Sequence, residues 1–131
     1  YKPHYDITTD ADSILATFST SPAIRNAKWN LVTEAIGTFA LVFGALCISE
    51  PTDSLGALEA LPVGLLVLGI GLALGGPTGY AINPARDLGP RIAHAVLPIS
   101  GKRDSDWSYA WVPVVGPIAG GLLGAFLFSC L

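Results

Sequence analysis

The amino-acid sequence predicts an all-α membrane protein with three transmembrane helices and one short re-entrant half-helix. The first reason is composition, since 51% of the residues are hydrophobic and only 13% are charged, whereas a soluble domain usually carries about 25% charged residues. The second is the presence of three long apolar runs, because a helix needs about 20 mostly apolar residues to cross a bilayer. The third is a short segment that begins like a helix but is too polar to face lipid.

Composition also argues against several functions. The net charge of −3 offers no basic surface, so no nucleic-acid partner is expected. Cys47 and Cys130 fit neither a disulfide framework nor a zinc site, and we expect them to act as small hydrophobic residues. His4 and His94 have no metal-ligating neighbours at helical spacing, and no catalytic group of serine, cysteine and histidine is evident. We therefore expect no enzyme activity, no cofactor and no metal.

The first predicted element is a polar loop over residues 1–30, followed by a transmembrane helix over 31–49. The apolar run 31–49 is long enough to cross a bilayer, although Glu34 and two threonines interrupt it. Trp29 precedes the run, and tryptophan prefers the level of the lipid headgroups.

The second transmembrane helix is predicted over residues 61–76, after a loop over 50–60. This apolar run is marginal in length by itself. Residues 55–60, which include Glu59, can lengthen it.

A re-entrant segment is predicted over residues 77–108, with a half-helix at 84–97. At 1.5 Å per residue the half-helix reaches roughly 21 Å, well short of a full crossing. Pro84 suits the first helical position, where its missing N–H costs nothing, and Asn83 is a good N-cap. At membrane depth such a broken element must be buried in protein or line a wet cavity.

The last predicted element is a transmembrane helix over residues 109–131. Aromatic residues open this run, and glycines recur at every fourth position within it: Trp107, Tyr109 and Trp111, then Gly116, Gly120 and Gly124. Small residues four apart let two helices approach closely. Glycine is also common in membrane helices, which explains the number of glycines better than their regular spacing.

Three spans and a half-helix make an odd number of crossings, which is typical of one unit of an inverted repeat. Tyr1 lies inside a loop and Leu131 inside an apolar run. No second copy of the pattern is found in the sequence, so we expect the partner repeat to lie outside it.

The start of the half-helix carries the side chains best suited to meet a solute. Asn83 can cap the helix with its oxygen and still donate from its amide NH₂. The helix N-terminus carries roughly half a positive charge, which attracts the oxygen of water or a hydroxyl and repels cations. Arg86, about one turn further, offers five donors that suit the hydroxyls of a polyol. The alternative is a structural arginine paired with Asp87 or Asp104.

The run Asn83-Pro84-Ala85-Arg86 resembles the second signature motif of the aquaporin superfamily, and the similarity extends from about Phe18 onward. The order of elements resembles that family's second repeat, so the expected fold is one half of an inverted-repeat aquaporin-type bundle. In that family the asparagine donates to the permeant at mid-pore and the arginine forms the outer constriction. The resemblance implies these roles for Asn83 and Arg86.

Residues around the motif resemble the aquaglyceroporins. These channels carry Asp directly after the arginine, a basic residue four positions later, and proline with a non-aromatic residue in the last span, as at Asp87, Arg91 and Pro113-Val114. Strict water channels have histidine where this chain has Gly71, which leaves room for a carbon chain. Tyr80 matches an aromatic position of the glycerol channels, although phenylalanine is more usual there in bacterial members.

The resemblance also implies a pore lining and its support. Glu34 is expected to accept hydrogen bonds from backbone N–H groups of the re-entrant loop, without touching solute. Thr78 and Gly79 are expected to present backbone carbonyls to the pore. The implied pore residues are Asn83, Arg86, Gly71, Tyr80, Gly79 and Ala81, and the implied structural support is Glu34, Pro84 and Asp87.

The family resemblance and the distribution of charge predict opposite orientations of the chain in the membrane. The resemblance places residues 1–30 outside the cell and 50–60 in the cytoplasm. The loop 50–60 holds acidic residues and no lysine or arginine, so counting positive charges would reverse this. The basic residues of the other side are Lys2, Arg25, Lys28, Lys102 and Arg103. We follow the resemblance, because the missing first half normally dominates orientation.

The expected function is that of a passive channel for glycerol and other small uncharged solutes, with water, that excludes ions and protons. The resemblance implies a homotetramer in a bacterial plasma membrane, with the lipid bilayer and the missing first repeat as partners. Two alternatives stay open. A strictly water-selective channel is one, against which Gly71 and Asp87 argue; a non-conducting membrane scaffold is the other, in which Arg86 is a structural ion pair.

Overall fold

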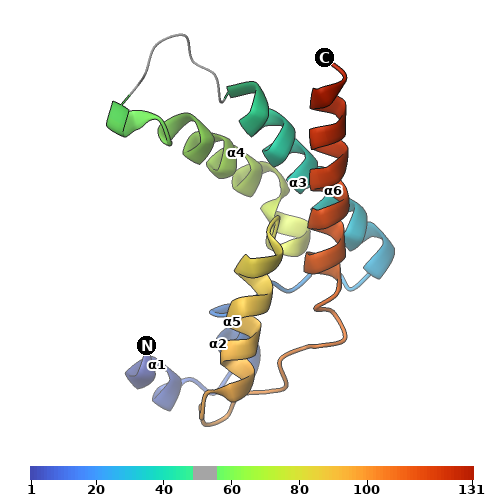
Figure 1. The fold of residues 1–131 in the computed structure, drawn as a ribbon. Coiled ribbons are helices and arrows are strands. Elements are labelled where there is room, and N and C mark those ends of the chain that lie inside the picture. Colours follow the sequence, from blue (N-terminus) through green and yellow to red (C-terminus); the bar gives the residue numbers. More distant parts are fainter. Residues whose placement is uncertain (49–55) are drawn as a thin grey trace.

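The structure is a computed structural model that describes residues 1–48 and 56–131, and these two ranges contain helices joined by turns and loops. Three of the helices are long and apolar enough to cross a membrane: α3 (Ala27–Ile48), α4 (Leu61–Thr78) and α6 (Val112–Ser129). They share one half of the molecule, and the shorter α5 (Pro84–Val96) lies in the other half (Figure 1). The predicted all-α fold with three spanning helices and a half-helix is confirmed.

The helix bounds differ from the expected ones by a few residues. α3 begins at Ala27 instead of residue 31, because the side chain of Asn26 accepts a hydrogen bond from the Trp29 N–H at 3.3 Å and starts the helix early. α4 continues to Thr78, where Gly79 ends it with a left-handed φ of 75°. The loop expected over 50–60 is described only from Gly56, where a short 3₁₀ helix, η1 (Gly56–Leu58), precedes α4; residues 49–55 lie outside the described part of the chain.

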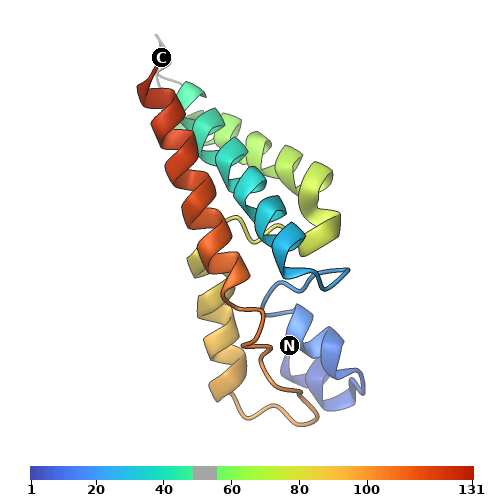
Figure 2. The same cartoon turned by 90° about the vertical axis from the view of Figure 1, so that its right-hand side faces the viewer.

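The polar segment 1–30, expected to be a loop, contains two short helices, α1 (Lys2–Ile7) and α2 (Ala11–Ala16). The side chain of Asp10 caps α2 by accepting a hydrogen bond from the Asp12 N–H. α2 can fold here because Ile14 and Leu15 are almost fully buried and give it an apolar face. Figures 1 and 2 show both helices at the same end of the molecule as α5.

α3 and α6 run side by side with their backbones in close contact, and the glycines of α6 form the contact line (Figure 2). A Cβ atom placed on Gly120 would lie 2.0 Å from the carbonyl oxygen of Ala35, and one on Gly124 would lie 3.0 Å from that of Phe39. At this helix separation Gly120 cannot hold a side chain, and a side chain at Gly124 would require the backbone of α3 to shift by a few tenths of an ångström. The four-residue spacing of glycines in the sequence thus marks the face of α6 that packs on α3.

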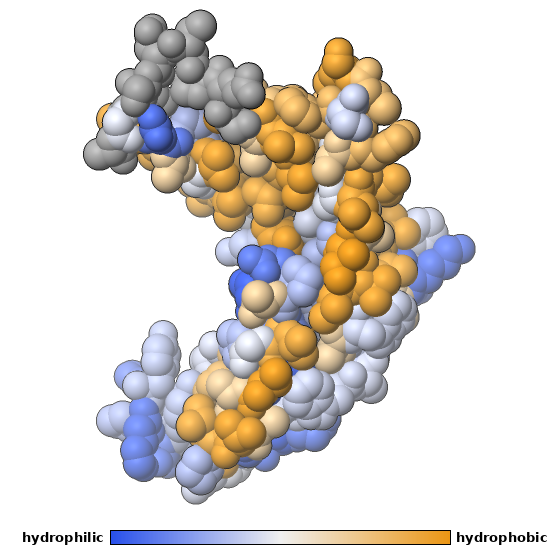
Figure 3. Space-filling view, viewed as in Figure 1, coloured by the Kyte–Doolittle hydropathy of each residue, from blue (hydrophilic) through white to orange (hydrophobic). Residues whose placement is uncertain are grey.

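Both ends of α5 are closed by polar groups. Asn83 caps its N-terminus, and the ammonium group of Lys102 donates to the carbonyl oxygens of His94, Ala95 and Leu97 at the C-terminus. A cation at this end also complements the helix dipole. α5 packs against α6, and the surface is mostly apolar over the three long helices and more polar over the half that contains α5 (Figure 3).

Candidate functional site

The turn between α4 and α5 has an unusual backbone. Gly79 ends α4, and its N–H donates to the carbonyl oxygen of Gly75 at 2.8 Å. Tyr80 and Ile82 follow with left-handed φ angles of 40° and 43°. Non-glycine residues in this region cost on the order of 1–3 kcal/mol each, so they persist only where neighbouring groups hold them.

Glu34 of α3 holds this turn. Its side chain is buried, with 1% of the residue exposed. One carboxylate oxygen accepts from the Ala81 N–H at 3.0 Å and the other accepts from the Ile82 N–H at 2.7 Å. Gly37, one helical turn further, admits the Ile82 side chain, because a Cβ atom there would lie 2.9 Å from Ile82 Cγ2. The strained turn is therefore fixed by two hydrogen bonds and a close apolar contact with α3.

The N-terminus of α5 presents Asn83 and Arg86 to an open side of the chain, where both are exposed. Asn83 Oδ1 accepts from the Ala85 N–H at 2.9 Å and from the Arg86 N–H at 3.4 Å. Pro84 occupies the first turn of the helix, where no N–H is needed. With Asn83 Oδ1 engaged in the cap, its amide NH₂ is the group left to donate toward a solute.

The Tyr80 ring lies between α4 and Arg86. A Cβ atom placed on Gly71 would lie 3.2 Å from Tyr80 Cζ, and one on Gly75 would lie 2.9 Å from Tyr80 Cδ1. The Arg86 guanidinium carbon lies 5.5 Å from the ring centroid, within the range of a cation–π contact. The ring borders a cavity of about 490 Å³, which is lined by Gly64, Val67, Leu68, Gly71, Leu72 and Tyr80. An apolar wall and a set of hydrogen-bond donors thus meet at one place.

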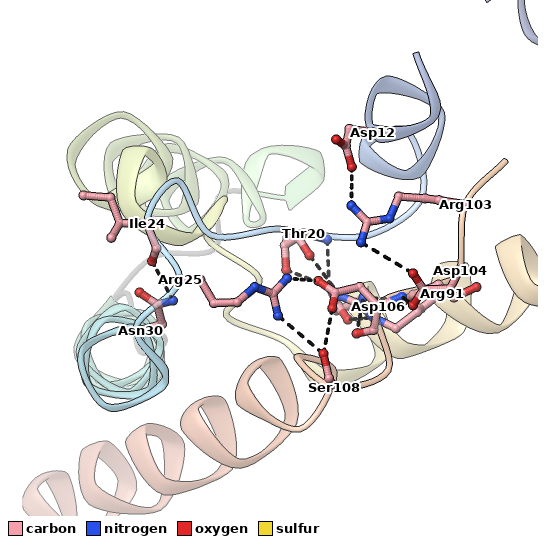
Figure 4. Close-up of polar contacts among 12 residues, drawn as sticks. Asp12, Thr20, Ile24, Arg25, Asn30, Arg91, Arg103, Asp104, Asp106 and Ser108 are labelled. Carbon is pink, nitrogen blue, oxygen red and sulfur yellow. Dashed lines mark hydrogen bonds and ion pairs between the residues drawn. The ribbon is translucent and has the colours of Figure 1, made fainter. Parts of the chain in front are cut away.

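A buried ion pair fastens α5 to two loops. Asp87 and Arg91 are fully buried, and Arg91 Nε donates to Asp87 Oδ1 at 2.8 Å. Asp87 Oδ2 also accepts from the Thr20 N–H and hydroxyl at 2.8 and 2.6 Å. Arg91 donates to the carbonyl oxygens of Thr20, Ser105 and Asp106 (Figure 4). Asp87 therefore pairs with Arg91, which leaves the Arg86 guanidinium outside this network.

Asp106 continues the network on the loop between α5 and α6. Its carboxylate accepts from Arg25 and from the Ser108 hydroxyl at 3.0 Å (Figure 4). Burial alone would raise the pKa of the Asp106 carboxyl, but the hydrogen bonds from Arg25 and Ser108 outweigh burial and hold that pKa below its usual value. The loop is thus anchored by a charged aspartate on both its backbone and its side chain.

The residues expected at the site fall into two groups. Gly71 and Tyr80 line the cavity together, and Arg86 does not line it but lies over the Tyr80 ring. Gly79 is half-buried in the turn, whereas Ala81 is fully buried and its N–H is bonded to Glu34, so Ala81 offers no surface to a solute. Pro84, Glu34 and Asp87 lie around the turn and the start of α5. They are not among the residues that line the cavity.

Two residues were missed in the sequence analysis. Gly75 lies under the Tyr80 ring, and its position four residues after Gly71 was a usable signal, because residues four apart share one face of a helix. Thr20 binds Asp87 from 67 positions away in the sequence, and no spacing rule links the two.

Comparison with known proteins gives a family match and several curated relatives. The chain matches the family model described as "Major intrinsic protein" over residues 5–128. It is 58% identical to "Glycerol uptake facilitator protein 3" of Lactiplantibacillus plantarum and 60% identical to "Probable glycerol uptake facilitator protein" of Thermotoga maritima, each over all 131 residues. It is 46% identical over 130 residues to "D/L-lactic acid transporter" of Lactiplantibacillus plantarum. The aligned regions cover 54%, 56% and 54% of these relatives, so the chain spans about half of their length.

Proposed function

Because the chain belongs to the major intrinsic protein family, we propose that it forms, with a second repeat, a passive channel for glycerol and other small uncharged solutes, with water. The chain is an integral membrane protein, and its bacterial relatives fit a plasma membrane. Passage through such a channel needs no covalent step, so we propose no enzyme activity and no cofactor.

The observation that carries this proposal is the position of the Tyr80 ring, which lines the cavity together with Gly71 and has the Arg86 guanidinium carbon 5.5 Å from its centroid. A polyol has one edge of CH groups and one edge of hydroxyls. The Tyr80 ring offers the first edge an apolar wall, and the Arg86 guanidinium offers the second edge donors in a fixed fork. Gly71 adds no side chain of its own, so the width here depends on the Tyr80 ring.

The N-terminus of α5 supplies the filter against ions in this proposal. Asn83 donates from its amide to the oxygen of a passing water or hydroxyl, at the positive end of the α5 dipole. A cation meets that positive end and the Arg86 charge together, and both repel it. A chain of water molecules must reorient around Asn83, which interrupts proton transfer along it. Gly79, which is half-buried in the turn, supplies a backbone carbonyl on the approach in this proposal, whereas Thr78 is fully buried within this chain and, contrary to expectation, offers none.

The second repeat completes the channel in this proposal. The side of α4 that lines the cavity carries exposed apolar side chains, among them Leu68 and Leu72, of which Leu72 is 80% exposed. Such a surface needs a covering of protein or lipid. We propose that the second repeat closes the cavity, and that lipid and other copies in a homotetramer cover the outer faces of α4 and α6.

The test is transport by the full-length protein in liposomes. We expect glycerol uptake and osmotic water flow well above those of protein-free liposomes, with no proton or potassium conductance. Water flow without glycerol uptake would instead identify a strictly water-selective channel, and no flux of either would identify a scaffold. Lactic acid uptake faster than glycerol uptake would reassign the preferred solute.

A further inference from the structure

The Tyr80 ring rests on two glycines one helical turn apart in α4. A Cβ atom on Gly75 would lie 2.9 Å from Tyr80 Cδ1 and 3.4 Å from Cε1, and a Cβ atom on Gly71 would lie 3.2 and 3.3 Å from Cζ and Cε2. Carbon atoms in favourable contact are about 3.5–4.0 Å apart. At Gly75, therefore, even a methyl group would displace the ring.

The backbone of Tyr80 is held on both sides, so a shift of the backbone cannot move the ring away from α4. Before Tyr80, the Gly79 N–H is bonded to the Gly75 carbonyl oxygen. After Tyr80, the N–H groups of Ala81 and Ile82 are bonded to Glu34. A clash at Gly75 is therefore relieved by rotation of the Tyr80 side chain away from α4.

Rotation of this ring changes the passage, although Gly75 itself is not part of the cavity wall within the described chain. The ring forms that wall together with Gly71, and Arg86 lies over the ring. We propose that Gly75 is a positioning residue that sets selectivity between glycerol and water by seating the Tyr80 ring against α4. This inference rests on the proposed function, since it concerns the width of the same passage.

α4 offers a matched control for this idea. Apart from its chain neighbours and the backbone of α4 itself, a Cβ atom on Gly76 meets no atom of the described chain within 4 Å, unlike one on Gly75. Gly75→Ala and Gly76→Ala make the same chemical change in neighbouring positions of one helix, so the gain in helix propensity is similar in both. A difference between them reports the contact with Tyr80.

The experiment is a double-mutant cycle in the full-length protein, read as the ratio of glycerol uptake to water flow. We expect Gly75→Ala to lower this ratio about tenfold, which corresponds to about 1.36 kcal/mol on the barrier for glycerol, and Gly76→Ala to leave it unchanged. In a Tyr80→Ala background, Gly75→Ala should have no further effect, because the ring on which it acts is gone. An equal fall in both backgrounds, or an unchanged ratio in Gly75→Ala, would overturn the inference.

A second measurement, by fluorine NMR, reports the environment of the Tyr80 ring and does not depend on transport. With fluorotyrosine incorporated, the Tyr80 resonance is identified by its loss in Tyr80→Phe. We expect this resonance to shift in Gly75→Ala and to stay in place in Gly76→Ala. A resonance that is unmoved in both variants would overturn the seating of the ring even if the wild type passes no glycerol. Failure of wild-type glycerol uptake with a shifted resonance would instead overturn the proposed function alone.

Discussion

Glu34 supplies two acceptors to a turn whose backbone is strained at Tyr80 and Ile82. The two oxygens accept hydrogen bonds from two buried N–H groups, for which the hydrocarbon core of a membrane offers no water as an alternative acceptor. The same contacts fix the direction in which the Tyr80 ring and the start of α5 point. A single carboxylate in α3 thus supports a site to which it contributes no surface.

The first prediction is that Glu34→Ala lowers the stability of the full-length protein. Each buried donor left without a partner costs about 1–3 kcal/mol, and two are left here. The melting temperature in detergent measures the loss, with Thr33→Ala as the control, because among the described residues the Thr33 hydroxyl bonds only to the Trp29 carbonyl oxygen of the same helix. We expect a clear fall for Glu34→Ala alone, with stability affected more than selectivity. Unchanged melting and unchanged flux would count against the role.

The second prediction concerns Gly71→His. The new ring would compete with Tyr80 for space, since even a Cβ atom at this position lies 3.2 Å from Tyr80 Cζ. We expect glycerol uptake to fall tenfold or more, while water flow falls far less, because each 1.36 kcal/mol added to a barrier slows passage about tenfold. Equal losses of both fluxes would indicate misfolding, and an unchanged ratio with intact fluxes would remove Gly71 from the constriction.

At the scale of single residues, the sequence predicted the roles of the polar side chains but not the conformation of the backbone. The Asn83 cap followed from Asn-Pro at a helix start, and the contact of Glu34 with the loop followed from a family resemblance. The left-handed φ angles of Tyr80 and Ile82 carry no signal in residue type, since neither is glycine or asparagine. The seat of the Tyr80 ring follows from that backbone, so its dependence on Gly75 was visible only in three dimensions.

At the scale of elements, the packing of α3 on α6 depends on glycines that permit backbone contact. The separation of the two helices leaves no space for a methyl group at Gly120, where the nearest atom belongs to the backbone of Ala35. A backbone atom cannot rotate away as a side chain can. The helices must separate along their whole contact if this position is filled.

The third prediction is therefore that Gly120→Ala destabilises the protein, whereas its neighbour Gly121→Ala does not. A Cβ atom on Gly121 makes an ordinary contact at 3.6 Å with Val42 Cγ2, but one on Gly120 overlaps Ala35 at 2.0 Å. Overpacking of this kind costs about 1–3 kcal/mol, offset in part by better helix propensity. Melting temperatures of the two variants in detergent give the comparison. Equal melting of the two would show that α3 and α6 can separate without cost.

The elements that sequence predicted best were those with one dominant cause. The three long helices follow from apolar length, and the start of α5 follows from Asn83 and Pro84. α1 and α2 were missed because they are six residues each, and α2 depends on burial of Ile14 and Leu15 that no local pattern announces. The exact ends of α3 and α4 depend on Asn26 and Gly79, single residues whose effect is set by neighbouring backbone.

At the scale of the whole molecule, the chain is open on the side that carries the proposed pathway. Asn83, Arg86 and the Leu68–Leu72 side of α4 are exposed together, although a channel needs walls all round. About half the length of the curated relatives is represented, which accounts for one half of such a wall.

The fourth prediction is that this chain alone does not conduct. Liposomes containing only residues 1–131 should show glycerol uptake at the level of protein-free liposomes, since one wall of the passage is absent. Co-reconstitution with the partner repeat should restore uptake. Robust uptake by the chain alone would contradict the inverted-repeat arrangement, unless cross-linking shows that two copies pair to close the passage.

The hydrogen bonds of Asp87 and Arg91 also bear on the order in which the chain can assemble. Their partner Thr20 is synthesised 67 residues before Asp87 and 71 residues before Arg91. The other partners of Arg91, Ser105 and Asp106, are synthesised after it. Closing so long a segment has an entropic cost that short-range contacts avoid. A chain synthesised from its N-terminus can therefore place α3 and α4 first, but it can lock α5 only after residue 106 has emerged. The end of the unit that carries the proposed selective residues is thus completed only after the loop that follows α5 has been synthesised.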